Sequence, residues 1–88
     1  MKLKSYLVKI FKSKKIKINK KDYTANFFEK NILDSIQFLN LISEIEKDLK
    51  ITFRNKDFRS NKFFTINNLS KLVNKKINDK KKRYFKPD

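Results

Sequence analysis

The 88-residue chain contains no cysteine, no histidine and no glycine. Without cysteine and histidine it forms no disulfide and offers no thiolate or imidazole to a metal ion. It also lacks the cysteine nucleophile and the imidazole base on which many enzymes depend near neutral pH. A chain of this length fits one small domain, so most of its large apolar side chains are expected to share one core. These absences argue against an enzyme and against a metalloprotein.

Long apolar runs are missing as well. No stretch approaches the roughly 18 consecutive apolar residues that a membrane-spanning helix needs. Lysines interrupt the N-terminal segment, and no small-residue cleavage site follows it, so it does not match an export signal. We therefore expect a cytoplasmic protein without a transmembrane segment.

Acidic residues are few, nine against 24 lysines and arginines, which gives a formal net charge of +15. Such a charge is typical of proteins that bind nucleic acid or an anionic membrane surface. However, the excess is almost entirely lysine, whereas bidentate phosphate and base-edge recognition favour arginine. Lysine, asparagine and isoleucine are abundant together, a bias that AT-rich coding also produces. Binding of a polyanion through the lysine-rich segments Lys2–Lys21 and Lys75–Lys86 is therefore kept as the alternative function.

Three segments carry apolar residues at helical spacing, which predicts an all-α fold with three main helices. They are residues 3–12, residues 35–50 and a last segment that starts after Thr65 and runs to Ile77. Asp34 and Thr65 stand where the N-caps of the second and third helices belong. The side chains expected to face the core are Leu3, Leu7, Ile10, Phe11, Phe38, Leu39, Ile42, Ile45, Leu49, Ile66, Leu69, Leu72, Val73 and Ile77.

The connection over residues 14–34 is long and poorly periodic, which is unusual inside a compact domain. Its aromatic residues Tyr23, Phe27 and Phe28 are expected to hold it against the core as an ordered segment that can include a short helical turn. Its length therefore does not exclude a single compact domain.

The connection between the second and third helices starts with the apolar link Ile51-Thr52-Phe53. Residues 55–60 are predicted to form a short helical turn with Phe58 directed inward. Beyond the last helix, the run from Asp79 loses its apolar periodicity and ends near a proline, as a mobile tail does. We expect a domain over residues 1–78 and a basic, mobile tail over residues 79–88.

A short motif, Asn31-Ile32-Leu33-Asp34-Ser35-Ile36, stands at the start of the second predicted helix. A serine in a first helical turn presents its hydroxyl at an exposed end, where free amides and the helix dipole favour an anion. Asp34 can cap the same turn and hold the serine in place. An Asp-Ser pair is also common as a simple cap, so the pair alone does not identify a function.

Together with the order of the helices, this motif resembles the modification site of acyl and peptidyl carrier proteins, in which Asp-Ser followed by Leu or Ile opens the second helix. The resemblance extends from Phe27 to Ile77. It implies a small four-helix carrier-protein bundle, with three main helices and one short one. It also implies a 4'-phosphopantetheine arm on Ser35 that holds an acyl or aminoacyl group as a thioester. The missing cysteine is no obstacle, because the reactive sulfur belongs to the arm.

The same resemblance assigns roles to the residues around the serine. Asp34 becomes the cap and a contact for the modifying enzyme, and Ile36 becomes a docking residue for partners. Glu44, Glu46 and Asp48 form an acidic stretch in a basic chain, and complementary charge on a partner would speed its encounter with them. Ile36 can equally be an ordinary core residue at the edge of the helix, and any one carboxylate can be merely solvated.

The implied partners are a phosphopantetheinyl transferase, an acyl- or aminoacyl-loading ligase, and downstream transferases or synthases of fatty acid or specialised metabolite biosynthesis. The carrier itself would be a monomer and not an enzyme. The chain departs from the family in its basic charge, in Gln37 and Ser43, and in Ile32 and Leu33 where a glycine is common. The form Ile32-Leu33-Asp34-Ser35-Ile36 is more similar to free-standing carriers that serve amino-acid ligases, surface-glycan or small specialised pathways than to the central fatty-acid carrier. A carrier-like fold that serves unmodified as a structural subunit is a third hypothesis.

Overall fold

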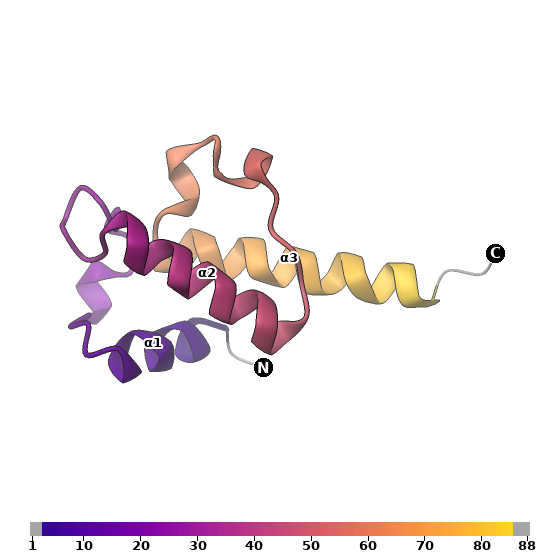
Figure 1. Ribbon diagram of the computed structural model, residues 1–88, viewed down its shortest axis with the longest axis horizontal. Coiled ribbons are helices and arrows are strands. Elements are labelled where there is room, and N and C mark those ends of the chain that lie inside the picture. The colour runs from indigo at the N-terminus through magenta and orange to yellow at the C-terminus, as the bar shows by residue number, and fades with distance from the viewer. Residues whose placement is uncertain (1–2, 86–88) are drawn as a thin grey trace.

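The computed structural model describes residues 3–85, which form three α-helices joined by two long connections (Figure 1). The helices are α1 (Leu3–Ser13), α2 (Ser35–Leu49) and α3 (Ile66–Phe85). Short 3-10 turns interrupt the connections at Lys20–Asp22, Asn55–Phe58 and Asn61–Phe63. Residues 3–85 contain no strand. The predicted all-α fold with three main helices is confirmed, and the turn at Asn55–Phe58 supplies the predicted short element as a 3-10 helix.

One apolar core joins the three helices and both connections. Every helix contributes fully buried side chains, and Phe27 enters the same core from the first connection. A well-packed core of this kind supplies most of the stability of a small domain. The largest fully buried side chains are Phe11, Phe27, Leu7, Leu41, Ile45, Ile66, Leu69 and Val73.

The inward face of α2 differs from the prediction at one leucine. Leu39 was expected in the core but is 63 % exposed, whereas Leu41 is 1 % exposed. The buried positions of α2 are Phe38, Leu41, Ile42 and Ile45. Successive side chains of a helix point about 100° apart, so Leu39, next to Phe38, already faces away from this stripe. The prediction for Leu39 was therefore wrong.

The third helix begins as predicted and ends later. The hydroxyl of Thr65 accepts a hydrogen bond from the amide of Asn68 at 3.1 Å, which confirms the predicted N-cap. The helix was expected to end before Asp79, but it continues to Phe85, and its last turns extend beyond the other two helices (Figure 1). Apolar periodicity stops where the helix leaves the bundle, yet lysine has a good helix propensity and neither glycine nor proline interrupts this part of the chain. Residues 86–88 of the predicted tail lie outside the described residues.

The long first connection is held against the rest of the fold by backbone hydrogen bonds as well as by aromatic packing. The amide of Phe27 donates to the carbonyl of Phe64 at 2.7 Å, and the amide of Asn67 donates to the carbonyl of Tyr23 at 3.0 Å. Phe27 is fully buried, while Tyr23 and Phe28 are half-buried against the core. The prediction that these aromatic residues hold the segment to the core is confirmed.

Three residues take the left-handed backbone conformation that glycine adopts without strain: Lys15, Asn31 and Lys50, with φ between 54° and 61°. After α1, the amide of Lys15 donates to the carbonyl of Lys12, and that of Ile16 donates to Phe11. This is the pattern of a Schellman helix end, whose left-handed position is most often glycine. Because the chain has no glycine, lysine and asparagine fill these positions at a cost of about 1 kcal/mol each.

A cluster of phenylalanine rings fixes the second connection against α2. Phe38 of α2 packs edge-on against Phe28, Phe58 and Phe64, with ring centroids 5.3–5.5 Å apart. Phe58 also contacts Phe53 at 5.4 Å. Edge-to-face aromatic pairs of this kind add about 0.5–1.5 kcal/mol each to the burial of the rings. The inward direction predicted for Phe58 is confirmed.

An ion pair ties the second connection to α3. The ammonium of Lys76 lies 2.7 Å from Oδ2 of Asp57, and the two side chains are 17 % and 12 % exposed. The same Asp57 oxygen accepts from the amide of Arg54 at 2.7 Å. Burial by itself would raise the pKa of Asp57, but the hydrogen bonds from Lys76 and Arg54, with the charges of Lys76 and Lys56, outweigh it and hold the pKa below its ordinary value of 3.8.

Replacing Asp57 by asparagine is expected to lower the free energy of unfolding by about 1–3 kcal/mol at pH 7, because the Lys76 ammonium loses its partner. A carboxylate with a lowered folded-state pKa stabilises the fold above its ordinary pKa, and that stabilisation is lost as the pH falls through the folded-state value. The difference between parent and variant should therefore be constant from pH 7 to about 5 and shrink below about pH 4. Urea unfolding across this range measures it, with the exposed Asp79→Asn as control. A difference that stays constant down to pH 2.5 would contradict the role given to the pair.

Candidate functional site

Ser35 is the first residue of α2 and is exposed. Asp34 precedes it in extended conformation, and its Oδ1 accepts from the amide of Gln37 at 2.7 Å. In return, Oε1 of Gln37 accepts from the amide of Asp34 at 2.9 Å. This reciprocal arrangement is a capping box, and it fixes the backbone on both sides of Ser35. The predicted cap is confirmed, and Gln37, read from the sequence only as a departure from the family, proves to be its second half.

The segment before Asp34, residues 26–33, folds into a compact turn that leads directly into α2. Oδ1 of Asn26 accepts from the amides of Phe28 and Glu29 at 2.9 and 3.1 Å. The carbonyl of Phe27 accepts from the amides of Ile32 and Leu33 at 2.8 and 3.2 Å. Phe27 and Leu33 are both buried, so the chain is anchored in the core directly before the cap.

Anchoring continues on the helical side of the motif, where Phe38 is buried and its amide donates to the carbonyl of Asp34 at 2.9 Å. Asp34 thus accepts hydrogen bonds from the backbone amides of Gln37 and Phe38. The first amides of a helix have no partner within it, so those of Ser35 and Ile36 remain at the positive end of the helix dipole. An exposed hydroxyl at this place fits attachment of a phosphodiester, because the negative charge formed there is stabilised and no core side chain has to move.

A hollow lined with lysines lies beside the cap. Its volume is about 760 Å³, and Gln37, Asn31 and Ile32 of the motif segment form part of its wall. Its basic lining residues are Lys15, Lys17, Lys21 and Lys30. These side chains place a positive field next to the start of α2, which also favours an anion there.

Two large apolar side chains follow Ser35 on the surface of α2. Ile36 is 72 % exposed and Leu39 is 63 % exposed, and they are the large hydrophobic residues found exposed in the described chain. Residues three apart on a helix are neighbours on its surface, so the two form one small apolar patch beside the serine. The reading of Ile36 as a core residue is excluded, because it faces solvent. Leu39 was missed as a surface residue, although its spacing of three from Ile36 was visible in the sequence.

The three carboxylates predicted to dock partners all have contacts within the chain. Glu44 forms a salt bridge with Lys14 at 3.1 Å, and Oε2 of Glu46 accepts from the amide of Phe53 at 2.8 Å. Oδ2 of Asp48 accepts from the hydroxyl of Tyr6 at 2.8 Å. Burial, together with this bond to Asp48, raises the pKa of Tyr6.

These contacts place the carboxylates on different sides of α2. Glu44 and Asp48 face α1 and the residues after it, whereas Glu46 faces the connection that follows α2. The structure therefore does not gather them into one acidic patch with Ile36. They hold α2 to its neighbours, and a docking role for them stays a prediction.

Other kinds of site find no support in the described residues. Residues 3–85 hold no group of three or more acidic side chains that could bind a metal ion, and the chain has no histidine or cysteine. None of the helices described combines the length and the apolar character needed to cross a bilayer. No protein-family model matches the chain, and neither a curated protein nor a solved structure matches it.

Proposed function

We propose that this protein is an acyl or aminoacyl carrier whose cargo is held as a thioester on a 4'-phosphopantetheine arm attached to Ser35. The observation that carries the proposal is the exposed serine at the capped start of α2, followed directly by the exposed pair Ile36 and Leu39. The capped, anchored backbone holds the Cα of Ser35 in a defined, exposed place, and an apolar patch beside it gives an enzyme a surface to bind.

Each residue of the motif has a defined part in this proposal. The hydroxyl oxygen of Ser35 receives the phosphate, and the amides of the first turn stabilise the phosphodiester charge. Asp34 and Gln37 keep that turn in place through their reciprocal hydrogen bonds. The arm, when attached, supplies the thiol that this cysteine-free chain lacks.

The partners follow from the same proposal. A phosphopantetheinyl transferase would add the arm, a ligase would load the cargo, and transferases or synthases would remove it, so the carrier would perform no catalysis itself. Ile36 and Leu39 are the surface we assign to these encounters. A cytoplasmic location and a monomeric state belong to the same proposal.

Intact-mass measurement after incubation with coenzyme A and a broad-specificity transferase tests the assignment. The parent should gain the mass of one arm and Ser35→Ala should gain none. Ser43→Ala is the matched control, because Ser43 is an exposed serine of the same helix, and it should be modified like the parent. A folded parent that stays unmodified, or a Ser35→Ala protein that gains the arm, would overturn the proposal. The first of these results would favour an unmodified structural subunit.

A further inference from the structure

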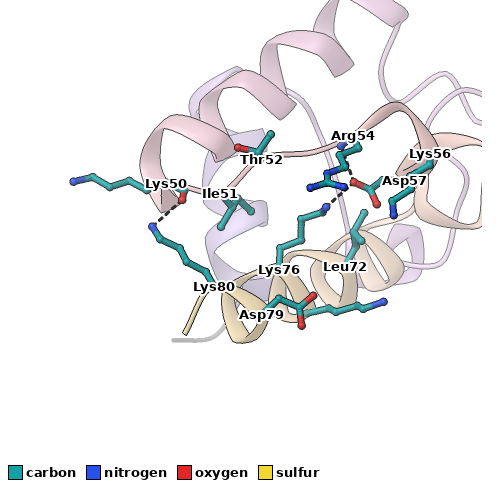
Figure 2. A pocket seen from close by; sticks show the side chains of 11 residues that line it. Lys50, Ile51, Thr52, Arg54, Lys56, Asp57, Leu72, Lys76, Asp79 and Lys80 are labelled. Carbon is teal, nitrogen blue, oxygen red and sulfur yellow. Dashed lines mark hydrogen bonds and ion pairs between the residues drawn. The ribbon is translucent and has the colours of Figure 1, made fainter. Parts of the chain in front are cut away.

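A second surface with its own chemistry lies at the far end of α2. The segment after α2 and the side of α3 form the walls of an open groove of about 580 Å³ (Figure 2). Six of the eleven residues that line it are lysine or arginine and two are aspartate. Most of the cations stand on opposite walls, with Arg54 and Lys56 on the connection and Lys75 and Lys80 on α3.

The charge of the groove is largely uncompensated. Among the described residues, the salt bridge found in the groove is that of Asp57 with Lys76, and it uses one charge of each sign. Five further cations line the groove and stand against Asp79; they are Lys50, Arg54, Lys56, Lys75 and Lys80. The ammonium of Lys80 donates to the carbonyl of Lys50 at 2.8 Å, which positions its charge without neutralising it.

The groove offers a partner little besides charge. Its two large apolar lining residues, Ile51 and Leu72, are buried, and no aromatic residue lines it within the described chain. Protein interfaces depend on aromatic or aliphatic anchors at their centre, which this surface lacks and the Ile36–Leu39 patch provides. A phosphate backbone, in contrast, is held by lysine and arginine charges alone, through release of its counterions.

We propose that this groove binds the phosphate backbone of nucleic acid without reading its base sequence. Lysine acts as a point charge rather than as a bidentate reader, and stacking of bases would need aromatic side chains, so binding rests on charge. The site is separate from the proposed carrier site. Ser35 is the first residue of α2, and Lys50 directly follows the last residue of that helix. Because a helix of 15 residues is about 22 Å long, the two sites lie at opposite ends of this length.

The test uses fluorescence anisotropy with a labelled 20-base-pair DNA duplex of mixed sequence over a series of salt concentrations. If four cations contact phosphates, the logarithm of the association constant should fall against the logarithm of salt concentration with a slope of about −3.6. The triple variant Arg54→Gln, Lys56→Gln, Lys75→Gln removes exposed charges of the groove. It should bind at least tenfold more weakly and with a slope less negative by about 2.7.

The matched control, Lys9→Gln, Lys12→Gln, Lys20→Gln, removes the same charge from exposed positions outside the groove and should bind within about twofold of the parent. Ser35→Ala should bind like the parent, which separates this proposal from that of the carrier. If both triple variants weakened duplex binding equally, the proposal that the groove is the binding site would be overturned, and binding would be assigned to the diffuse positive charge of the protein. Binding to phosphatidylglycerol vesicles but not to the duplex would overturn it in favour of a membrane surface.

Discussion

Leu41→Ala is expected to lower the free energy of unfolding by about 3–5 kcal/mol, whereas Leu39→Ala, two residues earlier on α2, should change it by less than about 0.5 kcal/mol. Leu41 is fully buried among the side chains of the core, and Leu39 faces solvent. Removing a buried leucine side chain loses its burial and leaves a cavity, while truncating an exposed one does neither. The comparison holds the residue type, the helix and the substitution constant.

Urea unfolding followed by circular dichroism measures both values. A domain of this size has a total stability on the order of 5–15 kcal/mol, so Leu41→Ala should show a midpoint clearly shifted to lower urea, or be unfolded at 25 °C. Equal destabilisation by the two substitutions would mean that Leu39 is packed in the core. That result would remove the apolar patch beside Ser35.

The second large effect is expected on the rate of arm addition, when the apolar patch of Ile36 and Leu39 is removed. The double variant Ile36→Ser, Leu39→Ser is expected to lower kcat/KM for addition of the arm by about 30-fold. Each lost apolar anchor of an interface costs about 1 kcal/mol or more, and two such losses multiply the effect. The free energy of unfolding should change by less than about 1 kcal/mol, because both side chains are exposed.

The control for this experiment lies on the same exposed side of α2. Asn40→Ser, Lys47→Ser changes two polar residues that face solvent, and its kcat/KM should stay within about threefold of the parent value. An unchanged kcat/KM in the apolar double variant would show that the transferase does not use the patch. A matching loss in the control would point to the helix as a whole rather than to Ile36 and Leu39.

The cap at the start of α2 could be predicted from the sequence, because it depends on local interactions. Asp34 stands one residue before a clear apolar stripe, and its side chain accepts from an amide only three residues away. The prediction of an ordered first connection also succeeded, since burial of the large aromatic side chain of Phe27 favours a place in the core, and Phe27 is fully buried.

Features that depend on tertiary contacts could not be predicted in this way. The partners of Glu44 and Asp48, which are Lys14 and Tyr6, lie 30 and 42 positions away in the chain, and no local pattern reveals them. The end of α3 was missed for a related reason. Apolar periodicity reports where a helix packs, not where it stops, and the end of α3 projects beyond its neighbours (Figure 1).

The basic groove was also beyond the reach of sequence patterns. Lysine-rich segments were visible at both ends of the chain, but Arg54 and Lys56 lie in neither of them. The fold places them on the wall across from α3, where Lys75 and Lys80 also line the groove. Two surfaces of different chemistry thus occupy the two ends of α2, an apolar patch beside Ser35 and a cationic groove beyond Lys50.

Localising the arm within the modified protein tests the carrier proposal most directly. Trypsin cleaves after Lys30 and Lys47, and the peptide between these sites contains two serines, Ser35 and Ser43. Fragmentation of the modified peptide in a mass spectrometer should place the whole added mass on Ser35 and leave Ser43 unchanged. An arm on Ser43, or an unmodified peptide from folded protein incubated with transferase and coenzyme A, would contradict the proposal.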